Sequence, residues 1–213
     1  MKESTPNKYP APIVIEAIRY FGIFISKIFW RIKFYGTENI PQNLESGLLV
    51  VPNHQTYFDP FWICIPIRRK YRFMAWDKVF EWFLVGDTIR YLGAFPVNLE
   101  RGSKEAFKQA VRALQDGATL IIFPEGEREF SDGNMLEFKN GAIKIALLAK
   151  VPILPVTIRG ANKVWAQDMK FPRFGKVEIF YHPVMEIPHG AEDRREQIEN
   201  LTDRLEEIIK SKM

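Results

Sequence analysis

The sequence has little of what marks several common classes of protein. It holds a single cysteine, Cys64, in 213 residues, so a disulfide framework and a cysteine-rich metal site are both excluded. That cysteine lies in an apolar run, where a small buried hydrophobe is a better interpretation than a nucleophile. The three histidines, His54, His182 and His189, are far apart and show no metal-ligand spacing.

Other signals are also missing. The polar start, residues 1–12, is not followed by an apolar core with a small-residue cleavage site, so we expect an intracellular protein without a secretory signal. No nucleic-acid-binding motif is present, and no internal repeat or low-complexity tract stands out. An apolar content of 46% and a charged content of 26% are typical of a globular protein, and the length favours one main domain.

Aromatic residues, by contrast, are plentiful. They make up 14% of the chain, and 17 of them are Phe. Such an excess suits a core, but it also suits a surface that meets lipid or acyl chains. The net charge of +4 fits attraction to an anionic membrane or to phosphate, and it also fits plain solubility.

Residues 13–32 form an apolar stretch of the length that spans a bilayer, about 20 residues. Four charged residues interrupt it: Glu16, Arg19, Lys27 and Arg31. At about 100° per residue, all four fall within about 60° of Glu16 on a helix, and burying them in hydrocarbon would be costly. We expect an amphipathic helix lying in the membrane interface, with its basic residues toward the head groups. The alternative is a helix packed on the core with an unusually wide apolar face.

The rest of the chain alternates strand-like and helix-like patterns. Continuous apolar runs at 48–51 and 119–123 are typical of buried parallel strands, whereas residues 77–92 favour a helix that Gly86 could break. The sequence therefore predicts an α/β fold with a mixed, largely parallel central sheet flanked by helices. We assign residues 1–35 to the membrane-contacting helical segment and residues 36–213 to the α/β domain.

The first candidate segment, residues 53–60, follows the first buried strand and reads Asn-His-Gln-Thr-Tyr-Phe-Asp-Pro. Five positions separate His54 from Asp59, so on a continuous helix they would lie about 140° apart and face away from each other. A turn before a helix that starts near Asp59 and Pro60 would let them meet. Asp59 would then accept from one ring nitrogen and leave the other as a general base. A satisfied structural histidine is the alternative.

The second candidate segment, residues 123–128, follows the other buried strand and reads Phe-Pro-Glu-Gly-Glu-Arg. Pro124 and Gly126 favour a rigid turn that a ligand can approach closely. Arg128 offers a planar, permanently charged group suited to phosphate. Glu125 would accept from a substrate hydroxyl or brace Arg128, and the alternative is a turn with a surface ion pair. Because sites in such sheets form beyond the carboxyl ends of the strands, we expect the two segments to meet.

Taken together, the two segments resemble the motifs of the glycerolipid acyltransferase family, of the 1-acylglycerol-3-phosphate acyltransferase type. Further stretches at 93–97, 138–141 and 151–156 also fit, so that the resemblance covers about residues 45–160. Motifs paired in this order and at this spacing are highly specific.

The resemblance implies that His54 is the general base and Asp59 its partner. The hydroxyl of lysophosphatidate would attack the thioester of acyl-coenzyme A or acyl carrier protein and give phosphatidate. Arg128 would hold the acceptor phosphate, and Glu125 with Gly126 would help to position the glycerol. No metal or prosthetic group is implied. The N-terminal helix would lie on the membrane, which places the protein in the cytoplasm, peripheral on the inner face of the cell membrane.

The sequence departs from the family pattern at three places near the expected phosphate. The family's Pro-Val-Asp-Arg is replaced at 96–99, where the nearest arginine is Arg101. A lysine usual after a short strand is replaced by Trp76, with Lys78 nearby, and a threonine usual before the motif arginine is replaced by Glu127. Arg101 and Lys78 are therefore further candidates for substrate binding. The alternative functions are an acyltransferase for a different lysolipid or lipid acceptor, and a membrane-binding module without catalysis.

Overall fold

The computed structural model describes residues 11–97, 104–188 and 195–213. Among these residues, seven strands form one sheet. In spatial order they are β1 (Lys33–Tyr35), β7 (Glu178–Tyr181), β6 (Ile153–Arg159), β2 (Leu48–Pro52), β5 (Thr119–Ile121), β3 (Tyr71–Trp76) and β4 (Ala94–Val97). Neighbouring strands are parallel except β6 and β7, which are antiparallel. The predicted α/β fold with a mixed, largely parallel sheet is confirmed.

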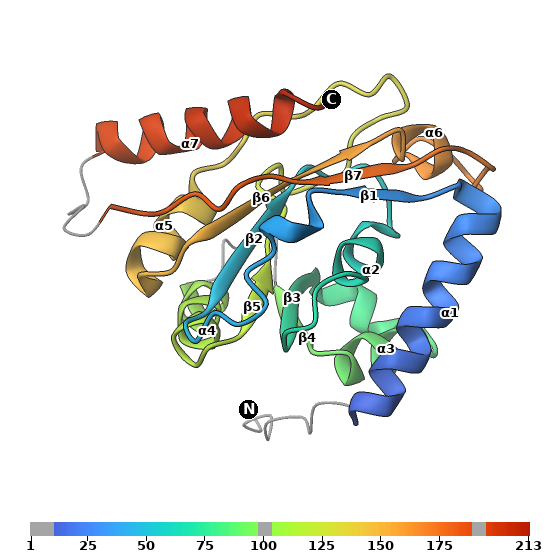
Figure 1. Ribbon diagram of the computed structural model, residues 1–213, viewed down its shortest axis with the longest axis horizontal. Helices are drawn as coiled ribbons and strands as arrows, with labels where there is room; N and C mark the ends of the chain where they lie inside the picture. The colour runs from blue at the N-terminus through green and yellow to red at the C-terminus, as the bar shows by residue number, and fades with distance from the viewer. Residues whose placement is uncertain (1–10, 98–103, 189–194) are drawn as a thin grey trace.

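Helices cover both faces of the sheet (Figure 1). Helices α4, α5 and α7 pack on one face, whereas α1, α2, α3 and α6 lie over the other. The α-helices are α1 (Pro12–Trp30), α2 (Asp59–Cys64), α3 (Val85–Tyr91), α4 (Lys104–Gln115), α5 (Gly141–Ala149), α6 (Asn162–Trp165) and α7 (Arg195–Lys210). The described residues also form two 3-10 helices, η1 (Thr37–Asn39) and η2 (Asp77–Glu81).

The central strand β2 shows how the core positions the candidate segments. Leu48 and Val50 pack into the core under α1 and α2, and Leu49 and Val51 pack into the core under α4 and α5. Such two-sided burial is the reason for the continuous apolar run. Since β2 and β5 are parallel, with Val50 opposite Ile121, their carboxyl ends open at the same edge of the sheet.

In helix α1, the side chain of Arg19 points the opposite way from the one expected. Arg19 is buried, donates from Nη2 to the carbonyl of Ile67 at 2.8 Å, and pairs with Glu16. The expectation that the basic residues all point toward head groups is therefore wrong for Arg19, whose carbonyl partner lies on the domain. The exposed side of α1 instead carries large apolar side chains: Ile13, Ile18, Tyr20, Phe21, Phe24, Ile28 and Phe29.

Within the described residues, no helix combines the length and the apolar character that crossing a membrane requires. The division of the chain at residue 35 stays a prediction. β1, which ends at that residue, pairs with β7 and is part of the sheet.

The helix predicted over 77–92 is divided, but not at Gly86. The structure has η2 and then α3, and between them Leu84 takes a left-handed φ of 62°. Gly86 lies inside α3, where a Cβ would come within 2.1 Å of the Phe80 carbonyl oxygen. The glycine thus serves close packing of α3 on η2, and the chain turns before it.

Candidate active site

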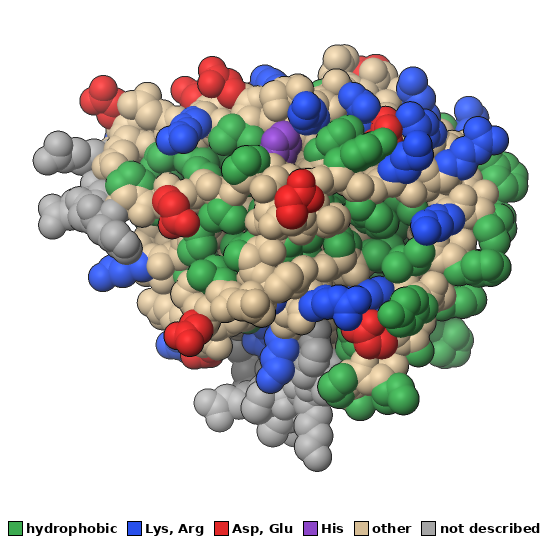
Figure 2. Space-filling model, in the orientation of Figure 1, with side chains coloured by type: hydrophobic (Ala, Val, Ile, Leu, Met, Phe, Trp, Pro, Cys, Tyr) green, Lys and Arg blue, Asp and Glu red, His purple; other side chains and the backbone are tan. Residues whose placement is uncertain are grey.

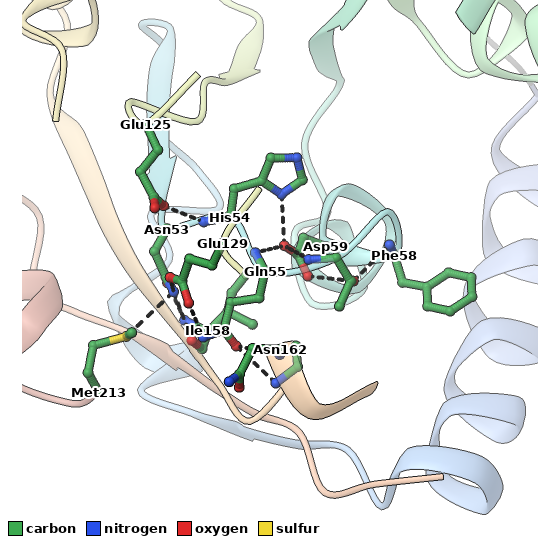
Figure 3. Close-up of polar contacts among 12 residues, drawn as sticks. Asn53, His54, Gln55, Phe58, Asp59, Glu125, Glu129, Ile158, Asn162 and Met213 are labelled. Carbon is green, nitrogen blue, oxygen red and sulfur yellow. Dashed lines mark hydrogen bonds and ion pairs between the residues drawn. The ribbon is translucent and has the colours of Figure 1, made fainter. Parts of the chain in front are cut away.

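His54 and Asp59 meet directly beyond the end of β2. Nδ1 of His54 lies 2.9 Å from Oδ2 of Asp59 (Figure 3). The turn predicted between the strand and the helix is present, and it folds the two side chains toward each other. Sequence reasoning placed these two residues together correctly.

The Asp59 carboxylate is fully buried and saturated with donors. Oδ2 also accepts from the backbone N–H groups of Gln55 at 2.6 Å and Thr56 at 2.8 Å, and Oδ1 accepts from the Thr56 hydroxyl at 2.8 Å. Such bonds stabilise a carboxylate in a low-dielectric setting. Helix α2 begins at Asp59, and Phe58 is its N-cap residue. If Asp59 were the N-cap, the helix would begin one residue later.

The other ring nitrogen of His54 is left available. Its ring stacks on Phe123 with centroids 3.9 Å apart, and 18% of the side chain is exposed. Among the described residues, Nε2 has no hydrogen-bond partner, and in Figure 3 it points away from Asp59. The arrangement can therefore receive a proton from a group that approaches the mouth of the site.

Glu125 connects the second segment to the first. Its Oε1 accepts from the backbone N–H of His54 at 2.6 Å, and its Oε2 accepts from that of Leu136 at 2.8 Å. Burial raises the pKa of Glu125 to about 8, although the two backbone N–H groups oppose the shift. The sequence suggested a substrate hydroxyl or Arg128 as partner, whereas the observed partners are both backbone amides.

Glu129 was missed by the sequence analysis. Its two oxygens accept from the side-chain amides of Asn53 at 2.9 Å and Gln55 at 2.8 Å, the neighbours of His54 on either side. Its own N–H donates to the His54 carbonyl at 2.7 Å. The side chain is fully buried, and burial raises its pKa to about 7. No signal in the sequence marks it, because its partners are 74 and 76 positions away.

Arg128 lies over the same loop. Its guanidinium carbon is 3.5 Å from the centre of the Tyr57 ring, a cation–π contact. Burial lowers the pKa of Arg128, while Tyr57 and Asp59 act in the other direction. Its Nη1 is buried and has no hydrogen-bond partner among the described residues. A buried cationic donor without an acceptor is unfavourable, so this group is suited to an incoming anion.

The remaining candidates are spread around this edge. Gly126 has a φ of 81°, which favours glycine in the predicted turn. Lys78 is exposed on η2, beyond the carboxyl end of β3, the strand next to β5. Arg101 lies outside the described residues. Within the described part of the chain, no three His, Cys, Asp or Glu side chains are grouped closely enough to hold a metal ion.

An apolar groove of about 320 Å³ lies between α1 and α2. Phe58, four residues after the histidine, forms part of its wall together with Ile18, Ile25, Phe61 and Cys64. Cys64 is buried, as expected, and burial raises the pKa of its thiol. The groove therefore offers an apolar surface close to the His54 loop.

Known proteins resemble this chain in sequence. The family model described as Acyltransferase matches residues 31–159. The 1-acyl-sn-glycerol-3-phosphate acyltransferase of Streptococcus pneumoniae is 36% identical over 147 residues, which are 66% of this chain and 53% of that protein. Its namesake from Bacillus subtilis is 25% identical over 181 residues, 84% of this chain and 86% of that protein. The chain spans about half the length of the Streptococcus relative and of a chloroplastic relative from Brassica napus, 53% of each.

A solved structure has the same fold. The crystal structure of the 1-acyl-sn-glycerophosphate (LPA) acyltransferase PlsC from Thermotoga maritima superposes with a TM-score of 0.77 at 30% identity. The superposition covers 93% of this chain and 77% of the other. Since the family model also matches more than half of the residues, this chain belongs to the Acyltransferase family.

Proposed function

We propose that this protein transfers a fatty acyl group from a thioester donor, acyl-coenzyme A or acyl carrier protein, to the free hydroxyl of lysophosphatidate, giving phosphatidate. The observation that carries the proposal is the 2.9 Å contact between His54 Nδ1 and Asp59 Oδ2 at the mouth of the sheet. The family and the names of the relatives support the same reaction.

The proposed mechanism uses His54 as a general base. The Asp59 carboxylate accepts from Nδ1, which fixes the proton there and leaves Nε2 to take the proton of the acceptor hydroxyl. The hydroxyl oxygen then attacks the thioester carbonyl carbon. Collapse of the tetrahedral intermediate breaks the carbon–sulfur bond, and the leaving thiolate takes the proton back from Nε2. The thioester is itself the activated acyl group, so no metal or prosthetic group takes part.

Arg128 supplies the proposed site for the acceptor phosphate. Its buried Nη1 lacks an acceptor among the described residues, and a phosphate oxygen would satisfy it. Gly126 and Glu125 hold the turn that carries it, and Lys78 and Arg101 remain candidates for further phosphate contacts. The apolar groove between α1 and α2 is the proposed place for acyl carbon atoms.

The proposal includes a membrane surface as partner, because the acceptor is a lipid. The exposed apolar side of α1 would lie in the interface, on the cytoplasmic side of the cell membrane. Support comes from the exposure of several Phe and Ile side chains along this helix, which would otherwise face water.

The direct test is an assay of the purified protein with lysophosphatidate and vesicles, using each donor type in turn. The wild type should form phosphatidate, and His54→Ala should reduce the rate to background while it still binds vesicles and unfolds cooperatively. Unchanged transfer by His54→Ala would overturn the base assignment. If the wild type transferred no acyl group from either donor, a membrane-binding module without catalysis would be the better reading.

A second acceptor class has one specific observation in its favour. Glu127 is exposed directly before Arg128 and adds a negative charge where a phosphate is expected. Another lysolipid, or a lipid acceptor with a less charged head group, would suffer less from that charge. A panel of lysolipids with the same acyl chain separates the two readings, since lysophosphatidate should give the highest kcat/KM.

A further inference from the structure

The loop between α6 and β7 exposes two large aromatic side chains within four residues. Residues 170–176 read Lys-Phe-Pro-Arg-Phe-Gly-Lys. Phe171 is 69% exposed and Phe174 is 76% exposed. Single exposed apolar residues are common on soluble proteins, but two on one short loop, alternating with basic residues, form a pattern that calls for a partner.

This loop is fixed to the end of α1. The Phe174 ring stacks on the Phe29 ring with centroids 5.5 Å apart and planes at 12°. Trp30 Nε1 donates to the Arg173 carbonyl at 3.0 Å, and Gly175 N–H donates to the Phe29 carbonyl at 3.4 Å. Phe174 therefore adjoins the exposed apolar side of α1 at Phe29.

Within the loop itself the charged side chains are all basic. No acidic residue occurs between Met169 and Val177, whereas Lys170 and Arg173 alternate with the two phenylalanines. Lys27 and Arg31 are exposed at the adjoining end of α1. Figure 2 shows Lys and Arg side chains gathered at the upper right, next to the hydrophobic side chains along the right-hand edge. Of the nearest acidic groups, Glu178 pairs with Arg159 and Lys176, whereas Asp168 accepts from the Ser131 hydroxyl and keeps its charge near Arg173.

We propose that loop 170–176 is a second lipid-contacting element, which inserts Phe171 and Phe174 into the interface of an anionic bilayer while Lys170 and Arg173 contact lipid phosphates. Aromatic rings beside basic residues suit the boundary between head groups and acyl chains. The inference deepens the proposed function, because it names a second point of contact with the same membrane. A bilayer is favoured over a protein partner because the apolar and basic groups of the loop adjoin the exposed apolar residues of α1 and its exposed Lys27 and Arg31.

A chain of aromatic contacts links this element to the site. Trp30, which is bonded to the loop, packs on Phe58 at 4.9 Å, and Phe58 packs on Trp165 at 5.2 Å. Trp165 in turn contacts Tyr57 at 5.0 Å, the residue under Arg128. With two anchors, α1 and the loop, the protein cannot pivot about one helix. The mouth of the site then keeps one orientation toward the bilayer.

The test measures binding of the full chain to two kinds of vesicle, phosphatidylcholine alone and phosphatidylcholine mixed with phosphatidylglycerol. The double variant Phe171→Ser, Phe174→Ser should lower the partition coefficient on both vesicles by roughly tenfold or more. The double variant Lys170→Gln, Arg173→Gln should lower it by about tenfold on the anionic vesicles only. Matched controls are Leu148→Ser, an exposed apolar residue on α5, and Lys108→Gln with Arg112→Gln on α4, all of which should bind as the wild type does.

Phe171→Ser alone is a safer variant, because the ring contact of the loop with α1 is made by Phe174. It should keep the wild-type unfolding temperature and lower binding by a few-fold. If all loop variants bound vesicles as well as the wild type does, the inference would be overturned. It would also be overturned if the wild type were a dimer and the loop variants were monomers, because the surface would then belong to contact with a second copy of the chain. If loop variants lost vesicle binding while the wild type transferred no acyl group in detergent, the lipid contact would stand and the proposed reaction would fail.

Discussion

In the loop 53–59, the buried carboxylate accepts hydrogen bonds from residues of the same loop. The buried carboxyl groups of the loop 123–129, by contrast, accept hydrogen bonds from residues of the other loop. The donors to Asp59 are at most five positions away from it in the sequence. Glu129, by contrast, accepts from residues 74 and 76 positions away, and Glu125 accepts from His54, 71 positions away, as well as from Leu136. The first loop therefore makes the proton-transfer pair, and the second loop determines where that pair sits.

Replacing the buried carboxylate of the loop 53–59 should have the largest effect on activity. Asp59→Asn replaces an acceptor of four hydrogen bonds with a group that has one acceptor oxygen, and it favours the wrong tautomer of His54. We expect kcat to fall by about 10⁴-fold with a much smaller change in KM, as for loss of the orienting carboxylate in other base–carboxylate pairs. Steady-state kinetics with saturating thioester measure it. Asp116→Asn, at an exposed position after α4, is the matched control and should leave kcat unchanged.

Breaking the hydrogen bonds that Glu129 makes between the two loops should lower the activity less, but it should lower the stability measurably. Asn53 Oδ1 accepts from Ile158 N–H at 2.7 Å, and Gln55 Oε1 accepts from Ala161 N–H at 2.9 Å, so both amides must present their NH₂ groups to residue 129. In Glu129→Gln an NH₂ group would meet another NH₂ group. We expect a loss of about 1–3 kcal/mol in the free energy of unfolding. We also expect kcat to fall by about 10- to 100-fold through misplacement of His54.

A reciprocal swap separates positioning from general damage. In the double variant Glu129→Gln, Gln55→Glu, the new carboxylate at position 55 accepts from the amide of residue 129 and from Ala161. The oxygen of residue 129 still accepts from Asn53. The swap should therefore recover most of the activity and stability that Glu129→Gln loses. If the double variant were worse than the single one, the hydrogen-bond account of Glu129 would be wrong.

The buried carboxyl groups of the second loop also predict a pH dependence of stability. Burial raises the pKa of Glu129 from 4.5 to about 7 and that of Glu125 from 4.5 to about 8. The folded protein thus holds these protons more tightly than the unfolded chain does. Their contribution to the free energy of unfolding is full below pH 4.5 and is lost as the pH rises to about 8.

Urea denaturation at a series of pH values measures this contribution. In Glu129→Gln the part of the decline that belongs to residue 129, between pH 4.5 and about 7, should disappear, while the part that belongs to Glu125 remains. The comparison uses the slope of the free energy of unfolding against pH, so the lower absolute stability of the variant does not affect it. An identical slope in both proteins would contradict the assignment.

The same contrast explains what could be predicted from the sequence. The pairing of His54 with Asp59 depends on one turn between a strand and a helix, and both neighbours are visible in the local pattern. The meeting of the two loops followed from the rule that parallel strands end at the same edge. The contacts of Glu125 with His54 and of Glu129 with Asn53 and Gln55 depend on the three-dimensional alignment of residues more than 70 positions apart, which no local pattern encodes.

Helix α1 and loop 170–176 show a second limit. Helical periodicity placed Arg19 on the same side as the other charges, but periodicity gives only relative directions and does not say which side meets the domain. In the structure Arg19 points inward and donates to the carbonyl of Ile67. The two phenylalanines of the loop gave no periodic signal, because the loop has no regular structure, and only their exposure identifies them.

The smallest expected effect belongs to Glu127, the exposed residue before Arg128. Its carboxylate lowers the electrostatic potential where the acceptor phosphate is proposed to bind, but water and salt screen an exposed charge. Glu127→Thr should lower the KM for lysophosphatidate by roughly two- to five-fold at low ionic strength, with kcat nearly unchanged. Glu127→Gln keeps the shape of the side chain and should give the same change, since only the charge matters. If threonine lowered KM and glutamine did not, the cause would be the side-chain shape, and no change in either variant would remove Glu127 from the description of the acceptor site.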